Sequence, residues 1–182
     1  KRVMALIVIF LIVIVFWMVF HQNGSTLTYF ADDNTDWNVT GTISNSINAF
    51  WVLTLTFPLV WFWKKLDERG LEPSTPTKMA IGMCLTGLSF FILYFAGKAG
   101  GDFGKVSPWW LISAYAVLTL GELMLSPMGL SLVSKVAPIR LRGLMMGGWF
   151  MATAIGNKLT GIGVLWDNML HSQFFALLGG MA

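Results

Sequence analysis

The chain has 182 residues, of which 55% are hydrophobic and only 12% are charged, and its mean hydropathy is +0.68. This composition excludes a soluble domain and indicates an integral membrane chain of several helices, because each spanning helix needs about 20 apolar residues. The net charge of +3 is therefore interpreted by where the basic residues fall along the chain, and not as a signal for nucleic-acid binding.

Apolar blocks along the chain predict an all-α polytopic membrane protein with five complete spanning helices and part of a sixth. We expect the first block to continue as a helix to about Phe30, where Asp32 and the polar residues after it end the helix. The last block has about half the required length, and the chain starts without an initiator Met, so we expect a fragment of a longer polypeptide. In chain order, the blocks cover residues 3–20, 43–63, 78–96, 109–133, 143–166 and 174–182.

Lysine and arginine are concentrated in every second loop, which orients the predicted spans. Nine of the 12 basic residues fall on one side, and such residues are enriched in the cytoplasmic loops of membrane proteins. We therefore expect this side to face the cytoplasm, with the chain in the inner (plasma) membrane of a cell. The nine residues are Lys1, Arg2, Lys64, Lys65, Arg69, Lys78, Lys135, Arg140 and Arg142.

The sequence lacks the patterns that are typical of enzymes and metal sites. Cys84 is the single cysteine and falls in a predicted span, so it forms no disulfide within the chain and no metal-binding pair. No nucleophile elbow, glycine-rich phosphate loop or Cys–His arrangement is found in the sequence. We therefore expect no enzymatic activity, no metal, no cofactor and no nucleic-acid partner.

Glu122 lies near the middle of the predicted span 109–133. A carboxylate at the centre of a bilayer costs about 3 kcal/mol or more, so such residues usually face a water-filled cavity or a partner and mark a path for ions or substrates. Ser126 shares its helix face, and Pro127 removes a backbone hydrogen bond and bends the helix beside the charge. These features indicate transport. The alternative is a proline kink with a carboxylate that a neighbouring helix satisfies.

Asn45 and Asn48 lie about two turns inside the span 43–63. An amide at that depth needs a polar partner, because an unpaired one costs about 1–3 kcal/mol or more in hydrocarbon. For Asn45 we expect hydrogen bonding to another helix, which is the usual role of asparagine in membranes. For Asn48 we expect a ligand contact, on the basis of the family resemblance described below.

Two further patterns mark the first and the fifth predicted spans. Trp17, His21 and Ser25 recur at helical spacing in the first span. An imidazole can change charge near neutral pH, so His21 is either a proton carrier or a structural residue. Gly143 and Gly147 form a small-xxx-small face in the fifth span, which predicts close packing against another helix.

Four stretches combine these polar residues with tryptophan, glycine and proline. They read FWMVFHQNGS at residues 16–25, SINAFW at 46–51, GELMLSPMGL at 121–130 and GGWF at 147–150. Taken together, they resemble the proton-dependent oligopeptide transporters of the major facilitator superfamily. The resemblance runs through residues 1–182. It implies that the chain forms most of the C-terminal six-helix bundle, from the seventh helix to the start of the twelfth.

The resemblance also implies roles for single residues. Glu122 and Asn48 would hold the free amino terminus of a di- or tripeptide, with Ser126 supporting Glu122. Protonation of Glu122, or of a partner in the N-terminal half, would supply the proton coupling, and His21 and Pro127 would serve coupling or gating. The residues that would line the pockets for peptide side chains are Trp17, Trp149, Phe10 and Thr153.

Two parts of the family pattern are missing from this chain. The N-terminal six-helix bundle, whose Arg and Lys residues would hold the peptide carboxylate, lies outside the sequence. Many relatives also carry an acidic residue just before the glutamine of the seventh helix, where this chain has His21. An outer gate formed by an acid and an arginine is therefore not implied here. Either the gate is built differently, or His21 takes part in proton handling.

The sequence thus predicts a half-bundle of a proton-coupled symporter that imports di- and tripeptides by alternating access. The proton gradient would drive it, without a cofactor. The expected partners are the peptide, protons, the lipid bilayer and the N-terminal bundle of the same polypeptide. Two alternatives stay open: a major facilitator exporter of drugs or sugars, and a membrane receptor or scaffold that does not transport.

Overall fold

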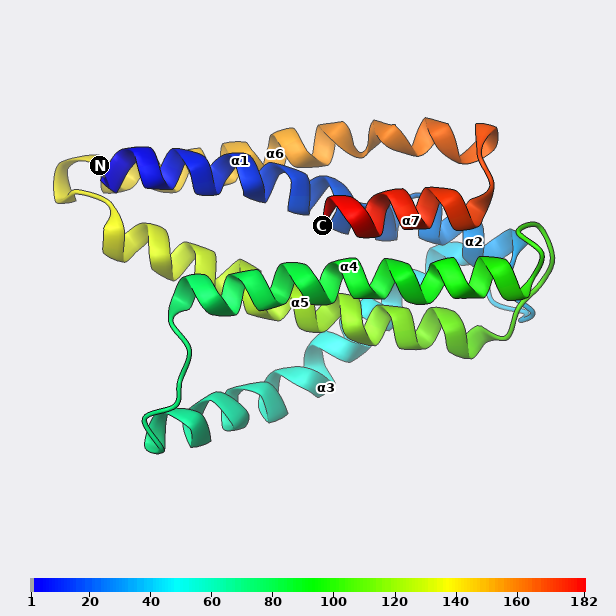
Figure 1. Cartoon of the computed structure of the whole chain (residues 1–182), viewed down its shortest axis with the longest axis horizontal. Coiled ribbons are helices and arrows are strands. Elements are labelled where there is room, and N and C mark those ends of the chain that lie inside the picture. The colour runs from blue at the N-terminus through cyan, green and yellow to red at the C-terminus, as the bar shows by residue number, and fades with distance from the viewer. Residues whose placement is uncertain (1) are drawn as a thin grey trace.

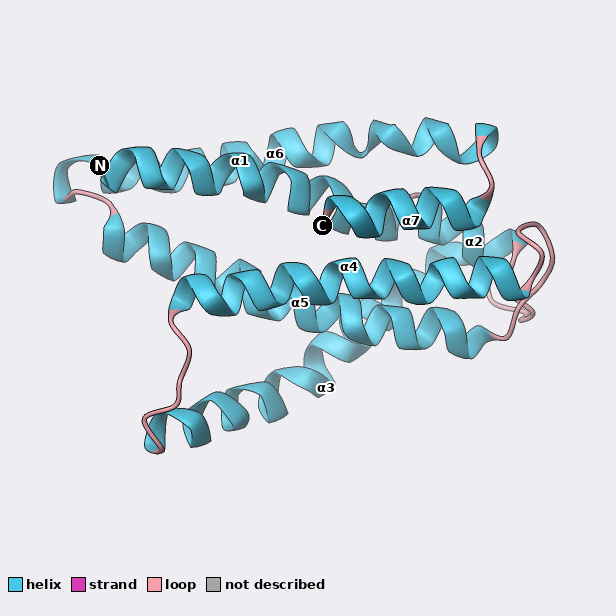
Figure 2. Cartoon of the chain, in the orientation of Figure 1, coloured by secondary structure: helices cyan, strands magenta, loops and turns pink. Residues whose placement is uncertain are grey.

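Helices make up nearly all of residues 2–182, which is the part of the chain that the computed structural model describes (Figures 1 and 2). These residues contain no strand, only an isolated β-bridge between Thr35 and Val106. The all-helical fold class is therefore confirmed. The elements are α1 (Arg2–Phe20), η1 (His21–Gly24), α2 (Thr26–Asp33), α3 (Gly41–Glu68), α4 (Thr75–Ala99), α5 (Pro108–Val136), η2 (Ile139–Leu141), α6 (Arg142–Leu159), η3 (Thr160–Asn168) and α7 (His171–Met181).

In the described part of the chain, four segments are long and apolar enough to cross a membrane: α1 continued through α2, and then α3, α4 and α5. In a bilayer the helix is the natural form for such sequences, because it satisfies every backbone polar group within one segment. Proline at the first turn starts both α4 and α5. The fifth predicted span is divided between α6 and the 3-10 helix η3. It is not among the four, although the sequence predicts a complete span there, because the sequence of α6 with its glycines, Asn157 and terminal charges is less apolar than the others.

The first span is not the continuous helix that the sequence predicts. It is interrupted between α1 and α2 by one 3-10 turn, η1. The buried side chain of Gln22 accepts hydrogen bonds from Ser25 Oγ and Thr26 Oγ1, both at 3.0 Å, and donates to the carbonyl oxygen of Thr160 at 3.1 Å. These side-chain bonds compete with the regular helical pattern and fasten the interruption to the end of α6.

Small residues set the distances between the packed helices. The position that a Cβ on Gly82 would take lies 2.8 Å from the carbonyl oxygen of Gly121, so α4 and α5 meet backbone to backbone. A Cβ on Gly156 would lie 2.6 Å from the carbonyl oxygen of Ile14, so α6 and α1 also meet backbone to backbone. The prediction of close packing at Gly143 and Gly147 is wrong within the described residues, because the space around both is open. The rotation of α6 about its axis instead turns Gly148 and Gly156 toward α1.

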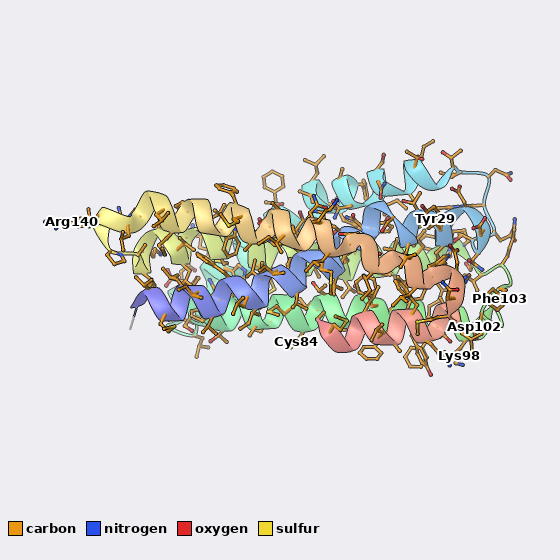
Figure 3. The ribbon with its side chains drawn as sticks, turned by 90° about the horizontal axis from the view of Figure 1, so that it is seen from above. Tyr29, Cys84, Lys98, Asp102, Phe103 and Arg140 are labelled. Carbon is orange, nitrogen blue, oxygen red and sulfur yellow. The ribbon has the colours of Figure 1, made fainter. Side chains whose placement is uncertain are left out.

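The two ends of the bundle differ in charge. In Figure 1 the N-terminus, the end of α3, the start of α4 and the η2 turn lie at the same end, which is where the basic stretches Lys64–Arg69 and Lys135–Arg142 fall. Figure 3 shows Arg140 at this end and Lys98 with Asp102 at the opposite one. The alternation of the basic loops is therefore present in the structure, while Lys1 lies outside the described residues.

Candidate functional site

Glu122 of α5 is half-buried and faces Asn48 of α3. The amide nitrogen Nδ2 of Asn48 donates to Glu122 Oε2 at 3.2 Å and to Thr119 Oγ1 at 3.0 Å. Asn48 is itself half-buried, whereas Thr119 is fully buried. The structure thus brings together the two residues that the sequence singles out for holding an amino group, and it joins them through a hydrogen bond between two helices.

A second set of hydrogen bonds joins the same two helices toward the end of the bundle opposite Arg140. The hydroxyl of Tyr115 lies 3.3 Å from Asn45 Oδ1 and 3.2 Å from the carbonyl oxygen of Asn23 in η1, so that its single proton is shared. Trp51 Nε1 donates to the carbonyl oxygen of Ile112 at 3.2 Å. The prediction that Asn45 makes a hydrogen bond between helices is confirmed.

These contacts form a ladder because the residues follow one face of each helix. Asn45 and Asn48 are three residues apart on α3, as are Thr119 and Glu122 on α5, and Tyr115 comes one turn before Thr119. Side chains at such spacings project from the same side of a helix. The sequence reasoning missed Tyr115 and Thr119 as partners of the asparagines, although their spacing from Glu122 already carried the signal.

Ser126 and Pro127 lie one turn after Glu122. Ser126 is half-buried, and no hydrogen bond joins it to Glu122 within residues 2–182. Pro127 is exposed and lies inside α5, where it cannot donate to the carbonyl oxygen of Leu123. The expected support of Glu122 by Ser126 is thus not a direct hydrogen bond here. Among the described residues, it is Asn48 that donates to the Glu122 carboxylate.

Three of the expected pocket residues meet where α1, α5 and α6 converge. The indole of Trp149 is almost fully buried over Gly129, where any side chain would overlap the ring. Phe10 packs edge-on against it, with ring centroids 6.5 Å apart. Thr153 Oγ1 donates to the carbonyl oxygen of Trp149 at 3.1 Å. Gly129 is seven residues after Glu122, so this aromatic group lies about 10 Å along α5 from the carboxylate.

Trp17 and His21 form a separate group at the end of α1. Their rings lie 5.1 Å apart, and Trp17 is 8% exposed, whereas His21 is half-buried. His21 Nδ1 lies 2.8 Å from the carbonyl oxygen of Trp17. A carbonyl only accepts, so Nδ1 carries the proton and Nε2 stays available. No hydrogen bond or ion pair connects His21 with Glu122 in the described part of the chain. The two residues are connected only indirectly, because Tyr115 of α5 contacts the carbonyl oxygen of Asn23 in η1, the turn that contains His21.

Two apolar hollows of the surface are lined by residues other than Glu122. One lies beside the start of α3 and is lined mainly by apolar side chains such as Ile43, Phe50 and Trp51. Another lies between α1 and α4 and includes Val13 and Met83. The described residues contain no group of three or more His, Cys, Asp or Glu side chains that could hold a metal ion. The polar ladder between α3 and α5 is therefore the candidate site.

Comparison with known proteins places this arrangement in a family. The family model of the POT family matches residues 1–166. A peptide transporter of Yersinia enterocolitica is 38% identical over 155 residues, which cover 81% of this chain and 30% of the relative. The dipeptide and tripeptide permease A of Escherichia coli is 32% identical over 178 residues, or 93% of this chain and 35% of the permease. The chain thus spans about a third of the length of these relatives.

Solved structures agree with the sequence comparison. A peptide transporter POT crystallised with alafosfalin superimposes with a TM-score of 0.88 at 32% identity, over 98% of this chain and 38% of the transporter. A POT family transporter in complex with a thioalcohol-conjugated peptide gives a TM-score of 0.87 at 28% identity, with the same coverage of 98% and 38%. The fold is therefore that of the matching part of POT family transporters. By sequence and by fold, the chain belongs to the POT family.

Proposed function

We propose that this chain is the C-terminal bundle of a proton-coupled symporter that imports di- and tripeptides. The observation that carries the proposal is the half-buried carboxylate of Glu122, held by Asn48 from the neighbouring helix. A carboxylate in a membrane span costs free energy unless a partner compensates for it. A peptide ammonium group is such a partner, because it forms charge-assisted hydrogen bonds with a carboxylate.

The comparisons support a peptide as the transported molecule. The relatives from Yersinia enterocolitica and Escherichia coli are peptide transporters, and a POT family transporter has been crystallised with a conjugated peptide. In this proposal, Glu122 and Asn48 hold the amino terminus, and Ser126 approaches Glu122 when the peptide is bound. The side-chain pockets are lined by Trp17, Trp149, Phe10 and Thr153.

The other half of the site comes from an N-terminal bundle of the same polypeptide, which holds the peptide carboxylate. Two observations support this part of the proposal. The chain spans about a third of its relatives, and α3 exposes large apolar side chains, among them Leu53 and Phe57, that lipid or a second bundle would cover. Transport then proceeds by alternating access, in which the two bundles rock around the bound peptide.

Proton coupling in this proposal resides at Glu122, which exchanges its proton as the peptide ammonium arrives and leaves. Pro127 lets α5 flex beside it. His21, with Nε2 available, tunes the gate at the end of α1. The chain lies in the inner (plasma) membrane, and the positive-inside rule places the stretches Lys64–Arg69 and Lys135–Arg142 on the cytoplasmic side.

Uptake by the complete polypeptide tests the proposal. In liposomes with an imposed inward proton gradient, we expect the wild type to accumulate labelled dialanine. We expect Glu122→Gln to abolish this uptake, because glutamine keeps the shape but neither titrates nor pairs with an ammonium group. Glu68→Gln, at the exposed end of α3, is the matched control and should transport normally.

Wild-type uptake rates in Glu122→Gln would contradict the proposed role of Glu122. A wild-type protein that moves drugs or sugars, but not dialanine, would point to the exporter alternative. A protein that binds peptide without moving it would point to a receptor.

A further inference from the structure

Thr119 lies at the centre of the contact between α3 and α5 and is fully buried. Its hydroxyl donates to the carbonyl oxygen of Tyr115 at 2.7 Å and accepts from Asn48 Nδ2 at 3.0 Å. A hydroxyl has a single proton and two lone pairs. Because the carbonyl oxygen takes that proton, Thr119 turns only an acceptor toward α3.

Glu122 also presents only an acceptor to α3 while it is ionised, and its Oε2 lies 3.2 Å from the same nitrogen of Asn48. The surface of α5 that Asn48 contacts therefore consists of two acceptors. With its amide turned over, Asn48 would set its own oxygen against both of them, and two hydrogen bonds would be replaced by two repulsive contacts. Only the orientation with the NH₂ group toward α5 satisfies all three residues.

This orientation decides what the site offers to a ligand. Both hydrogens of the Asn48 amide are used by Thr119 and Glu122, so its oxygen Oδ1 is turned away from α5. No described residue donates a hydrogen bond to this oxygen or to Glu122 Oε1. The two free positions are both acceptors. An ammonium group, which only donates, matches them, whereas an acylated amine has lost two of its hydrogens and gained a carbonyl oxygen.

We propose that Thr119 is a positioning residue, which holds the Asn48 amide with its oxygen toward the ligand and so makes the site selective for a free amino group. The inference rests on the proposed function and extends it to the choice between free and acylated peptides. Thr119 acts through Asn48 and does not itself contact the ligand. Without its hydroxyl, one of the two acceptors that fix the Asn48 amide is lost. The whole amide can then rotate about its Cβ–Cγ bond and turn an N–H toward the ligand, where it opposes an ammonium group.

Ligand binding to the purified complete polypeptide tests the inference. The measured quantity is the ratio of the dissociation constants of N-acetyl-dialanine and dialanine. We expect Thr119→Val to lower this ratio about three- to tenfold, the effect of one net hydrogen bond, mainly by weakening dialanine. Thr119→Ser, which restores the hydroxyl, should restore the ratio. If valine prevents folding, Thr119→Ala makes the same test with a smaller side chain.

Thr86→Val is the matched control. Thr86 is equally buried and bonds to a carbonyl of its own helix, Gly82 at 3.1 Å, but it has no contact with Asn48. We expect this variant to keep the wild-type ratio. A double-mutant cycle adds a second readout: in an Asn48→Ala background, Thr119→Val should leave the ratio unchanged, because the residue through which it acts is gone.

The inference is overturned if Thr119→Val weakens both ligands equally, if Thr119→Ser behaves like valine, or if the effect persists in the Asn48→Ala background. Each of these results would leave Thr119 with a purely structural role, while the proposed function stands. A wild-type protein that binds acetylated and free dialanine equally well would instead overturn the inference and the proposed amine site together.

Discussion

The helices α5 and α3 form the two sides of the polar ladder, but they are packed to very different extents. Along α5, buried residues recur through its whole length, and Gly121 packs it directly against α4. In α3 only Gly41, Ser44 and Trp63 are buried. Figure 1 shows α3 diverging from α4 and α5 toward its C-terminal end. Glu122 therefore sits on a packed scaffold, and Asn48 on a helix with little packing inside this chain.

Hydrogen bonds replace packing where α3 meets α5. The contacts of Asn45, Asn48 and Trp51 all fall within two turns of α3, before Pro58. Hydrogen bonds are directional, so they fix the rotation and the axial position of α3 near the ladder. They do not hold its C-terminal end, which diverges from α5. We conclude that changes on the scaffold act mainly on folding, and that changes on the ladder act mainly on the ligand.

The largest effect is expected from closing the space between α4 and α5. A methyl group on Gly121 would overlap the hydroxyl of Thr86 and lie 2.7 Å from the carbonyl oxygen of Gly82. Gly121→Ala should therefore destabilise the protein by about 3 kcal/mol, at the upper end of overpacking. Thermal unfolding of the purified complete polypeptide measures this loss. Gly180→Ala, with open space around it, should be as stable as the wild type or more so.

The next effect separates the two asparagines of α3. Asn48→Ala should weaken the binding of dialanine by about 1–3 kcal/mol, because it removes a buried polar contact with the amine and one with Glu122. Asn45→Ala should change binding little, since the partner of Asn45 is Tyr115. Isothermal titration of both variants decides between them. Equal losses of affinity would show that the ladder acts as a single unit.

A smaller effect, on stability, is expected at Asp102 in the loop between α4 and α5. Its Oδ1 accepts from the backbone N–H of Ser172 at 2.8 Å and so caps α7, and Lys98 Nζ lies 3.9 Å from Oδ2. Burial alone would raise the pKa of Asp102, but the contact with Ser172, whose backbone N–H donates to the carboxylate, and the charge of Lys98 outweigh it and lower the pKa. Asp102→Asn tolerates the positive φ of 69° and keeps an acceptor oxygen, so it should cost only about 0.3–1 kcal/mol at pH 7, the contribution of a negative charge at a helix N-terminus.

The pH dependence of this cost follows from the lowered pKa. An ionised Asp102 contributes its full stabilisation above the unfolded pKa of about 3.9, and the contribution is lost as the pH falls through the lower folded value. The melting temperatures of the wild type and Asp102→Asn should therefore differ at neutral pH and converge in acid. A difference that does not change with pH would mean that the carboxylate charge has no part in the cap.

The smallest effect is expected at His21, which touches neither half of the ladder. His21→Ala should lower the transport rate by a few-fold more than it lowers peptide affinity, because the residue lies beside the η1 interruption and not at Glu122. His21→Asp should keep transport and shift its pH optimum, since it replaces an imidazole by a carboxylic acid, and the two groups change charge in opposite directions from neutral. Uptake measured from about pH 5 to 8 tests both variants. Superimposable profiles for all three forms would make His21 a packing residue.

Sequence reasoning predicted the fold class and the approximate position of the long helices. A spanning helix is recognised from the hydropathy of about 20 consecutive residues, which does not depend on the helices that it packs against. It also selected Glu122, since the cost of a charge in a span depends on depth and not on neighbours. The family resemblance added Asn48. All of these signals are local in the chain, which is why they were readable without coordinates.

Tertiary structure alone decided which side chains meet. Asn48 pairs with Thr119 and Glu122 across more than 70 positions of the chain, and the interruption of the first span depends on a bond from Gln22 to Thr160 at the far end of α6. Such contacts depend on how far each helix is rotated and shifted against its neighbour. Hydropathy does not specify rotation within an almost uniformly apolar helix, so only the packing of small residues and the pairing of buried polar groups could determine it.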